Sequence, residues 1–207
     1  MEINNTNIRN FLNSNQKNVC LDCKNGKVYI DDSAMPIKTD ESENNYITYL
    51  ESSSITINGG SCKICGFSKF TCTKENLFLT EVMLEHDAVI PAAGRSLEFF
   101  GYGAMWRMVL REFDPWLQLH LYDNCTIKSG ILSKNTVVYI EDIELIIAGL
   151  NSSFLPESLR VDFYDNGFIK SFRTGADAFS PNMQNQKIPA GSRVFLDCNE
   201  KIVRVEE

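Results

Sequence analysis

One segment of this chain occurs twice, and the repetition limits the folds that the chain can adopt. LQLHLYDNCTIKS begins at Leu117, and LRVDFYDNGFIKS begins at Leu159, 42 residues later. Both copies read as a strand with alternating apolar residues, an Asp-Asn turn and a returning strand. Asn and Gly tolerate the positive φ angles that tight turns need. The spacing therefore predicts β-hairpins in tandem, each burying its apolar face on the next.

The same alternation of apolar and polar residues extends over most of the chain. The segments predicted as strands are residues 27–30, 45–50, 54–57, 76–84, 95–100, 117–122, 136–150, 159–164, 192–197 and 201–206. Helix signals are few: residues 6–15 read as one short helix capped by Asn5 or Thr6, and residues 104–113 read equally as a helix or a strand. We therefore expect a mainly β fold of antiparallel tandem hairpins, arranged as a β-sandwich, a barrel or an open repeat sheet.

Residues 31–45 are acidic and polar, and they read as a loop between an N-terminal part and the rest. We expect N-terminal hairpins with a zinc-ribbon-like element over residues 1–66. A β-hairpin repeat domain is expected over residues 67–207.

The charge distribution disfavours two classes of partner. The net charge is −7, and the 20 Lys and Arg residues are scattered along the chain rather than clustered. A nucleic-acid or anionic membrane surface would need a basic cluster. The chain also lacks an apolar run long enough for a transmembrane helix, and its first residues do not form a signal peptide. We expect a cytoplasmic protein that binds neither nucleic acid nor membrane.

Two Cys-x-x-Cys pairs are the clearest candidates for chemistry. Cys20 and Cys23 precede Lys-Asn-Gly, and Cys62 and Cys65 precede a glycine. Two cysteines at this spacing in a turn can direct both thiolates at one ion, and two such turns complete a tetrahedral zinc site. The pairs resemble zinc-ribbon knuckles, which implies a structural zinc ion on these four residues. The 38 residues between the pairs exceed the usual spacing of about 15 to 20, so the insert would loop out.

An interpretation without metal stays open. VCLDCKNGKVYI at residues 19–30 parallels VFLDCNEKIVRV at residues 194–205, where Phe195 takes the place of Cys20. The C-terminal copy has no Cys-x-x-Cys pair, so this hairpin pattern needs no metal. The cysteines would then be small core or turn residues. Redox chemistry is a third interpretation, although it needs the pair at a helix N-terminus in a βαβ unit.

The repeated turn resembles that of tandem β-hairpin proteins of the MORN-like type, whose repeats read aromatic-x-Asn-Gly-x-aliphatic across each hairpin. FYDNGFIKS matches this motif, and LYDNCTIKS departs from it at Cys125, where the family has Gly. The resemblance covers residues 117–207. It implies a binding surface or scaffold rather than an enzyme, and it carries over no catalytic residue.

The most aromatic segment, residues 98–116, is the candidate partner surface, because Trp, Tyr and Arg are enriched in interface hot spots. The residues expected to contact a protein partner are Tyr102, Trp106, Arg107 and Trp116; alternatively, these aromatics form the core between two halves of the chain. No phosphate-binding loop or nucleophile motif is present in the sequence. We therefore expect a non-enzymatic binding or scaffold protein, with zinc as its one candidate cofactor. A small hydrolase using Cys72, Cys125 or His120 in a cleft between hairpins is the alternative.

Overall fold

The computed structural model describes the backbone of residues 19–23, 26–30, 36–40, 45–58, 60–72, 77–102, 118–124, 126–180 and 186–207. Side chains are described for residues 55, 57–58, 60–64, 69, 79–102, 118–124, 126–179 and 187–207. The expected N-terminal helix lies outside these residues. The described part is built almost entirely of antiparallel strands, which confirms the mainly β prediction.

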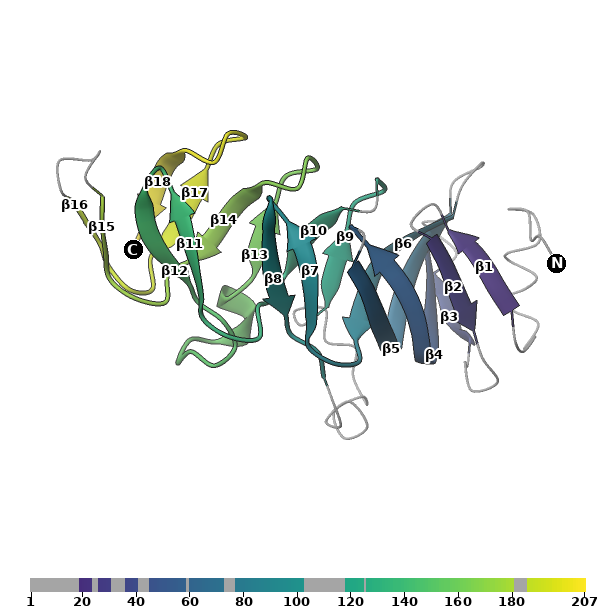
Figure 1. The fold of residues 1–207 in the computed structure, drawn as a ribbon. Coiled ribbons are helices and arrows are strands. Elements are labelled where there is room, and N and C mark those ends of the chain that lie inside the picture. Colours follow the sequence, from purple (N-terminus) through teal and green to yellow (C-terminus); the bar gives the residue numbers. More distant parts are fainter. Residues whose placement is uncertain are drawn as a thin grey trace.

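A ten-stranded antiparallel sheet runs the length of the protein (Figure 1). In spatial order its strands are β18 (Ile202–Glu206), β17 (Arg193–Leu196), β14 (Ile169–Arg173), β13 (Val161–Phe163), β10 (Ile127–Gly130), β9 (Leu119–Leu121), β6 (Leu77–Leu84), β5 (Gly60–Cys72), β4 (Asn45–Ile57) and β3 (Pro36–Asp40). The sheet does not close on itself, so of the three predicted arrangements the barrel does not form in the described part of the chain. Residue 66, where the sequence places a domain boundary, lies within β5.

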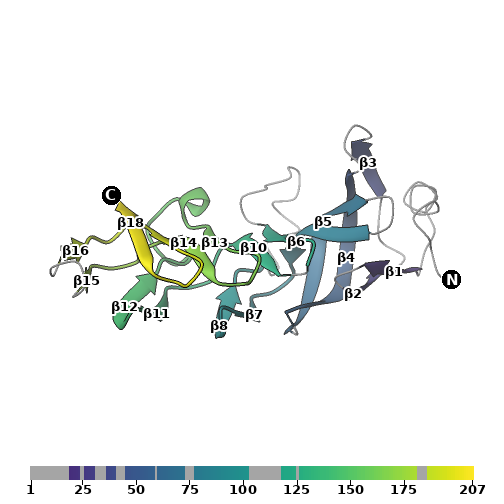
Figure 2. The ribbon, with the colours of Figure 1, turned by 90° about the horizontal axis from the view of Figure 1, so that it is seen from above.

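Four two-stranded hairpins accompany this sheet. They are β1–β2 (Val19–Cys23 and Gly26–Ile30), β7–β8 (Ala88–Ala92 and Arg95–Phe99), β11–β12 (Thr136–Ile140 and Ile143–Ile147) and β15–β16 (Ala178–Ser180 and Gln186–Ile188). Seen from above, β7–β8 and β11–β12 lie along one side of the row of sheet strands (Figure 2). The chain thus alternates between a hairpin in the sheet and a hairpin in this second layer. We call β7–β8, β11–β12 and β15–β16 the hairpin layer.

Backbone hydrogen bonds connect each second-layer hairpin to the next in the same way. The amides of Glu85, Ser133 and Gly175 donate to the carbonyls of Lys63, Glu98 and Ile146, at 2.9, 2.9 and 2.6 Å. Lys63 lies near the start of β5, so the tip of the long β4–β5 hairpin takes the position that β8 and β12 take further along. The repeat therefore begins before residue 117, where the sequence first shows it.

A second bond marks the end of each second-layer hairpin. An Asp or Asn just before the hairpin accepts a backbone N–H just after it: Asp87 from Gly101, Asn135 from Gly149 and Asp177 from Ala190, at 2.8, 2.9 and 2.8 Å. Each hairpin is thereby closed at its base by one side-chain oxygen. These closures satisfy backbone donors that the change of layer would otherwise leave without a partner.

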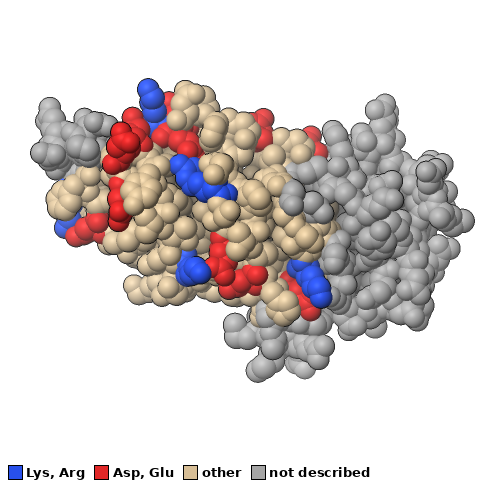
Figure 3. All heavy atoms as spheres, viewed as in Figure 1, with Lys and Arg blue, Asp and Glu red and all other residues tan. Residues whose placement is uncertain are grey.

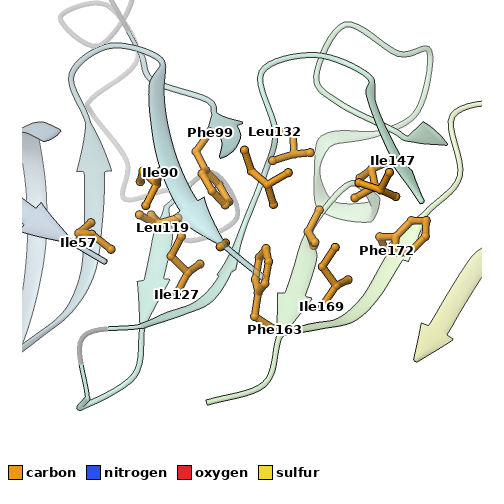
Figure 4. Packing of buried hydrophobic residues seen from close by; sticks show 14 of the residues in the cluster. Ile57, Ile90, Phe99, Leu119, Ile127, Leu132, Ile147, Phe163, Ile169 and Phe172 are labelled. Carbon is orange, nitrogen blue, oxygen red and sulfur yellow. The ribbon is translucent and has the colours of Figure 1, made fainter. Parts of the chain in front are cut away.

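The core fills the space between the sheet and the second layer (Figure 4). Buried residues of the sheet, among them Leu119, Phe163 and Phe172, face buried residues of the hairpins, among them Ile90 and Ile147. The rings of Phe99 and Phe163 lie 6.1 Å apart between their centroids and connect the two layers. This burial gives each hairpin a core that it could not form alone.

The repeated segment forms two equivalent hairpins, β9–β10 and β13–β14, as predicted. Asn124 and Asn166 accept the N–H two residues later in each turn, at 3.1 Å in both, which is the Asx turn that their side chains favour. Each aromatic residue before the turn bonds the next hairpin. The Tyr122 hydroxyl donates to the Phe163 carbonyl at 2.9 Å, and the Tyr164 hydroxyl donates to the Leu196 carbonyl at 2.7 Å.

One strand prediction and one loop prediction were wrong. Residues 136–150 form the hairpin β11–β12 rather than one strand, because Glu141 and Asp142 adopt φ angles of 48° and 66°. Those angles give a tight turn that usually carries Asn or Gly, so the turn has no strong sequence signal. The predicted loop at residues 31–45 contains the edge strand β3.

Candidate functional site

One row of residues crosses all ten strands of the sheet in register. Successive cross-strand partners are Ile37, Ile47, Lys69, Glu81, His120, Ser129, Asp162, Ser171, Phe195 and Arg204. Directly paired residues of antiparallel strands lie on the same face. From Lys69 onward most members are polar, and they lie on the face opposite the core. This row places the acid Glu81, the base His120 and the hydroxyl of Ser129 in succession.

The succession resembles a nucleophile arrangement, but the hydrogen bonds explain it as structural. The Arg160 guanidinium donates to the Ser129 hydroxyl at 2.7 Å, and Ser129 is buried. An exposed, base-activated oxygen would be needed for attack on a substrate. The corresponding network one hairpin later does without a histidine.

In that second network, Asp162 takes the place of His120. Its carboxylate accepts from Arg193 at 2.6 Å and from the Ser171 hydroxyl at 2.7 Å, and Arg193 also donates to Ser171 at 2.7 Å. Each polar group of this triad therefore has a partner. The recurrence of Arg and Ser in both hairpins indicates a network that pins neighbouring strands together. The hydrolase interpretation gains no support here, and the side chains of Cys72 and Cys125 lie outside the described residues.

The four predicted zinc ligands lie on two strands. Cys20 and Cys23 are on β1, and Cys62 and Cys65 are on β5, so both pairs fall within strand rather than within a turn. Of the four sulfurs, only that of Cys62 belongs to a described side chain. Within the described part of the chain, no three His, Cys, Asp or Glu side chains converge as a metal would require.

Cys62 fits the core better than a metal site. It is 3 % exposed and lies among the aliphatic core residues, and its Sγ is 3.7 Å from the Gly60 carbonyl oxygen. Burial raises the pKa of its thiol to about 11, which disfavours the thiolate that binds zinc. By the backbone bonds described above, Cys62 takes the position that Leu97 takes in β8 and Leu145 takes in β12. Zinc on the four cysteines stays a prediction, which the position of Cys62 does not favour.

The aromatic segment is described only at its start. Tyr102 is 5 % exposed and its ring packs against Phe100, with 5.4 Å between the centroids. Tyr102 is thus a core residue, in line with the second of the two interpretations of this segment. Trp106, Arg107 and Trp116 lie outside the described residues.

Four of the seven exposed large apolar side chains among the described residues belong to the hairpin layer; the other three are Leu155, Phe168 and Val203. Val89, Val137 and Phe179 are 58 %, 50 % and 65 % exposed, and each is the second residue of its hairpin. Each also follows the closing Asp or Asn by two residues, so the three positions are equivalent. Tyr139, 62 % exposed, extends this set on β11. We call these four residues the apolar stripe.

Several charged side chains of the hairpin layer have partners within the chain. Lys134 and Glu98 form an ion pair at 2.5 Å, Lys187 and Asp177 form one at 2.7 Å, and the Tyr139 hydroxyl donates to Glu144 at 3.0 Å. Figure 3 shows this side of the molecule, where most of the described surface is neither acidic nor basic. The stripe therefore offers apolar contact with little net charge beside it.

Sequence reasoning missed the stripe for an identifiable reason. Equivalent residues are separated by 48 positions between the first two hairpins and by 42 between the next two, as 89, 137 and 179 show. A search at one fixed spacing aligns only the last two. The signal available in the sequence was an Asp or Asn followed two residues later by an apolar residue.

Comparison with models of protein families, with characterised proteins and with solved structures finds no match to this chain. The resemblance to MORN-like repeats accordingly stays a prediction from the turn motif. Among the described residues, no helix is both long and apolar enough to cross a membrane.

Proposed function

We propose that this protein is a non-enzymatic binding or scaffold protein that contacts a protein partner through the apolar stripe. The observation that carries the proposal is the repeated exposure of Val89, Val137 and Phe179 at equivalent positions of three hairpins. Scattered exposed apolar residues are normal, whereas an aligned set marks a binding surface. Repeat proteins present such aligned positions to extended partners.

Two further properties support this proposal. The apolar residues are held by strands closed at their bases, so little conformational entropy is lost when a partner covers them. Several neighbouring charges already have partners within the chain, so binding would depend more on apolar burial than on salt concentration.

The proposal is tested by capturing proteins from the source cells on immobilised wild-type protein and on a variant with Val89→Ser, Val137→Ser and Phe179→Ser. A matched control carries Lys128→Ser and Lys170→Ser, which change two exposed residues of β10 and β14. We expect at least one purified protein to bind the wild type and the control with the same dissociation constant, and the stripe variant at least about tenfold more weakly. Equal binding of that protein to all three, with the variants folded, would contradict the proposal.

A further inference from the structure

The last strand of the ten-stranded sheet leaves one edge uncovered in the described structure. Among the described strands, β18 pairs with β17 alone, and outside that pairing the Ile202 N–H at its start donates to the Glu141 carboxylate at 3.1 Å. An edge strand directs alternate backbone N–H and C=O groups away from its sheet, where they can pair with another strand. This edge is one margin of the described sheet, and it is separate from the apolar stripe.

The side chains of β18 are arranged so that the strand complements itself. Arg204 and Glu206 lie on the same face and contact each other at 3.2 Å, with side chains 58 % and 52 % exposed. Val205 lies between them, on the other face, where it packs against the core. A strand that alternates a cation, an apolar residue and an anion opposes unlike charges when it pairs with an antiparallel copy centred on the apolar residue.

We propose that two copies of this chain associate through β18, antiparallel, with Val205 opposite Val205 of the second copy. In this register Arg204 of each copy faces Glu206 of the other, which gives two cross-strand pairs of opposite charge. The arrangement has two-fold symmetry, as closed homodimers require. It joins the two sheets into one and covers the partly buried Val205 at the end of the core.

The alternative registers are worse for this strand. Centring the pair on Arg204 would place two arginines opposite each other, and like charges in direct opposition destabilise a sheet. The β-bulge near Val203 interrupts the regular pairing with β17 between Arg204 and Ile202, so the regular part of the strand is Arg204 to Glu206. Val205 is the centre of that regular part. Two chains that each carry a net charge of −7 repel each other, and local pairs of opposite charge at the interface offset this repulsion.

Sedimentation velocity over a wide concentration range tests the proposal with four charge variants. Arg204→Glu and Glu206→Arg each place like charges opposite each other in both pairs, and the double swap Arg204→Glu, Glu206→Arg restores opposite charges. Lys201→Glu is the matched control, because it reverses an exposed charge of the same hairpin away from the paired segment. Far-UV circular dichroism checks that each variant is folded. Arg204→Glu also removes the contact of Arg204 with the Phe195 ring, whose centroid lies 4.0 Å away. Glu206→Arg keeps Arg204, so a weaker dimer of this variant cannot come from loss of that contact.

We expect the wild type, the control and the double swap to form dimers. Each single reversal is expected to raise the dimer dissociation constant about tenfold or more. An equimolar mixture of the two single variants should dimerise again, because each supplies the charges that the other lacks. A wild type that stays monomeric throughout would overturn the proposal and leave the edge to another partner. A dimer that both single reversals leave unchanged, or that the double swap fails to restore, would overturn it equally.

Discussion

Arg95 and Glu200 are 105 residues apart in the sequence, yet their side chains form an ion pair at 2.8 Å. Arg95 begins β8 in the hairpin layer, and Glu200 lies in the turn between β17 and β18 of the sheet. Arg95 also donates to the Tyr139 carbonyl at 3.1 Å, and Glu200 accepts the Ile169 N–H at 3.1 Å. The pair therefore joins four segments across both layers.

Breaking this pair should destabilise the fold measurably. The side chains of Arg95 and Glu200 are 25 % and 13 % exposed, so the charge left behind by Glu200→Gln or Arg95→Met would be only partly hydrated. We expect each substitution to lower the free energy of unfolding by about 1 to 3 kcal/mol. Urea denaturation of both single variants and the double variant measures the coupling between the two residues.

The control for this cycle is an exposed ion pair of the same protein. Lys187 and Asp177 are 52 % and 49 % exposed, so Lys187→Met should cost about 0.5 kcal/mol or less. A coupling energy near zero for Arg95 and Glu200, equal to that of the exposed pair, would show that the long-range link contributes no stability.

The hydroxyl of Tyr164 should stabilise the stack of hairpins through one bond. It donates to the Leu196 carbonyl at 2.7 Å, and Tyr164→Phe keeps the ring while it removes this donor. We expect a loss of about 0.5 to 1.5 kcal/mol in the free energy of unfolding. The Lys170 ammonium lies 5.7 Å from the ring centroid in the wild type and keeps its contact in the variant. Unchanged stability would mean that the Leu196 carbonyl is equally well bonded by water.

The raised pKa of the equivalent residue Tyr122 predicts that the free energy of unfolding depends on pH in the alkaline range. Burial raises the pKa of Tyr122, and the nearby carboxylates of Asp165 and Asp162 raise it further. Because the tyrosine of the unfolded chain ionises first, near pH 10, its contribution is complete below that pH and is lost as pH rises toward the folded pKa. Unfolding free energies between about pH 9 and pH 11 should fall less steeply in Tyr122→Phe than in the wild type. Parallel curves for the two proteins would exclude a contribution from Tyr122.

The sequence predicted most strands of the fold, because period-two alternation is a local property. The Asp-Asn turns at residues 123–124 and 165–166 correctly predicted the two sheet hairpins, because the conformation of a turn depends on adjacent residues. The turn at Glu141 and Asp142 was not predicted because it lacks the Asn-Gly or Asp-Gly pair that marks such a turn, and Glu141 is not a typical turn residue. Assignment of strands to the sheet or the second layer depends on contacts such as Arg95 with Glu200, which no local pattern contains.

The candidate site was less predictable for the same reason. Tyr102 is of a residue type that is common in interface hot spots, but it is buried where it lies, just after β8. Val89 and Phe179 are residue types that are common in any strand. They form one surface only because their hairpins lie in the same layer. An apolar residue in a strand faces core or solvent according to register, and the register of a hairpin is set by its turn.

Gly149 should not tolerate a side chain. A Cβ at this position would lie 2.1 Å from the backbone carbonyl carbon of Lys134, at the closed base of β11–β12. Because backbone would have to move, we expect Gly149→Ala to cost about 3 kcal/mol. The third repeat has Ala190 at this position, so Ala190→Gly is the control, with an expected cost of about 1 kcal/mol or less. Thermal unfolding of both variants measures the difference, and a mild effect of Gly149→Ala would mean that the closure adapts.

Two substitutions of Cys62 distinguish a core thiol from a zinc ligand. In the core, Cys62→Ala leaves a small cavity, whereas Cys62→Ser buries a hydroxyl among aliphatic residues and should cost more, about 1 to 3 kcal/mol. For a zinc ligand the two variants would behave alike, because both remove the thiolate. We expect Ser to be the more destabilising of the two.

Elemental analysis of protein produced with zinc present completes the comparison. We expect the zinc content of Cys62→Ala to equal that of the wild type, because Cys62 is enclosed by aliphatic core residues and no set of three potential ligands converges among the described side chains. About one zinc ion per wild-type chain, lost in both variants, would show that Cys62 is a ligand. In that case the equivalence of Cys62 with Leu97 and Leu145 would describe the backbone alone, and the first repeat would have exchanged a core position for a metal site.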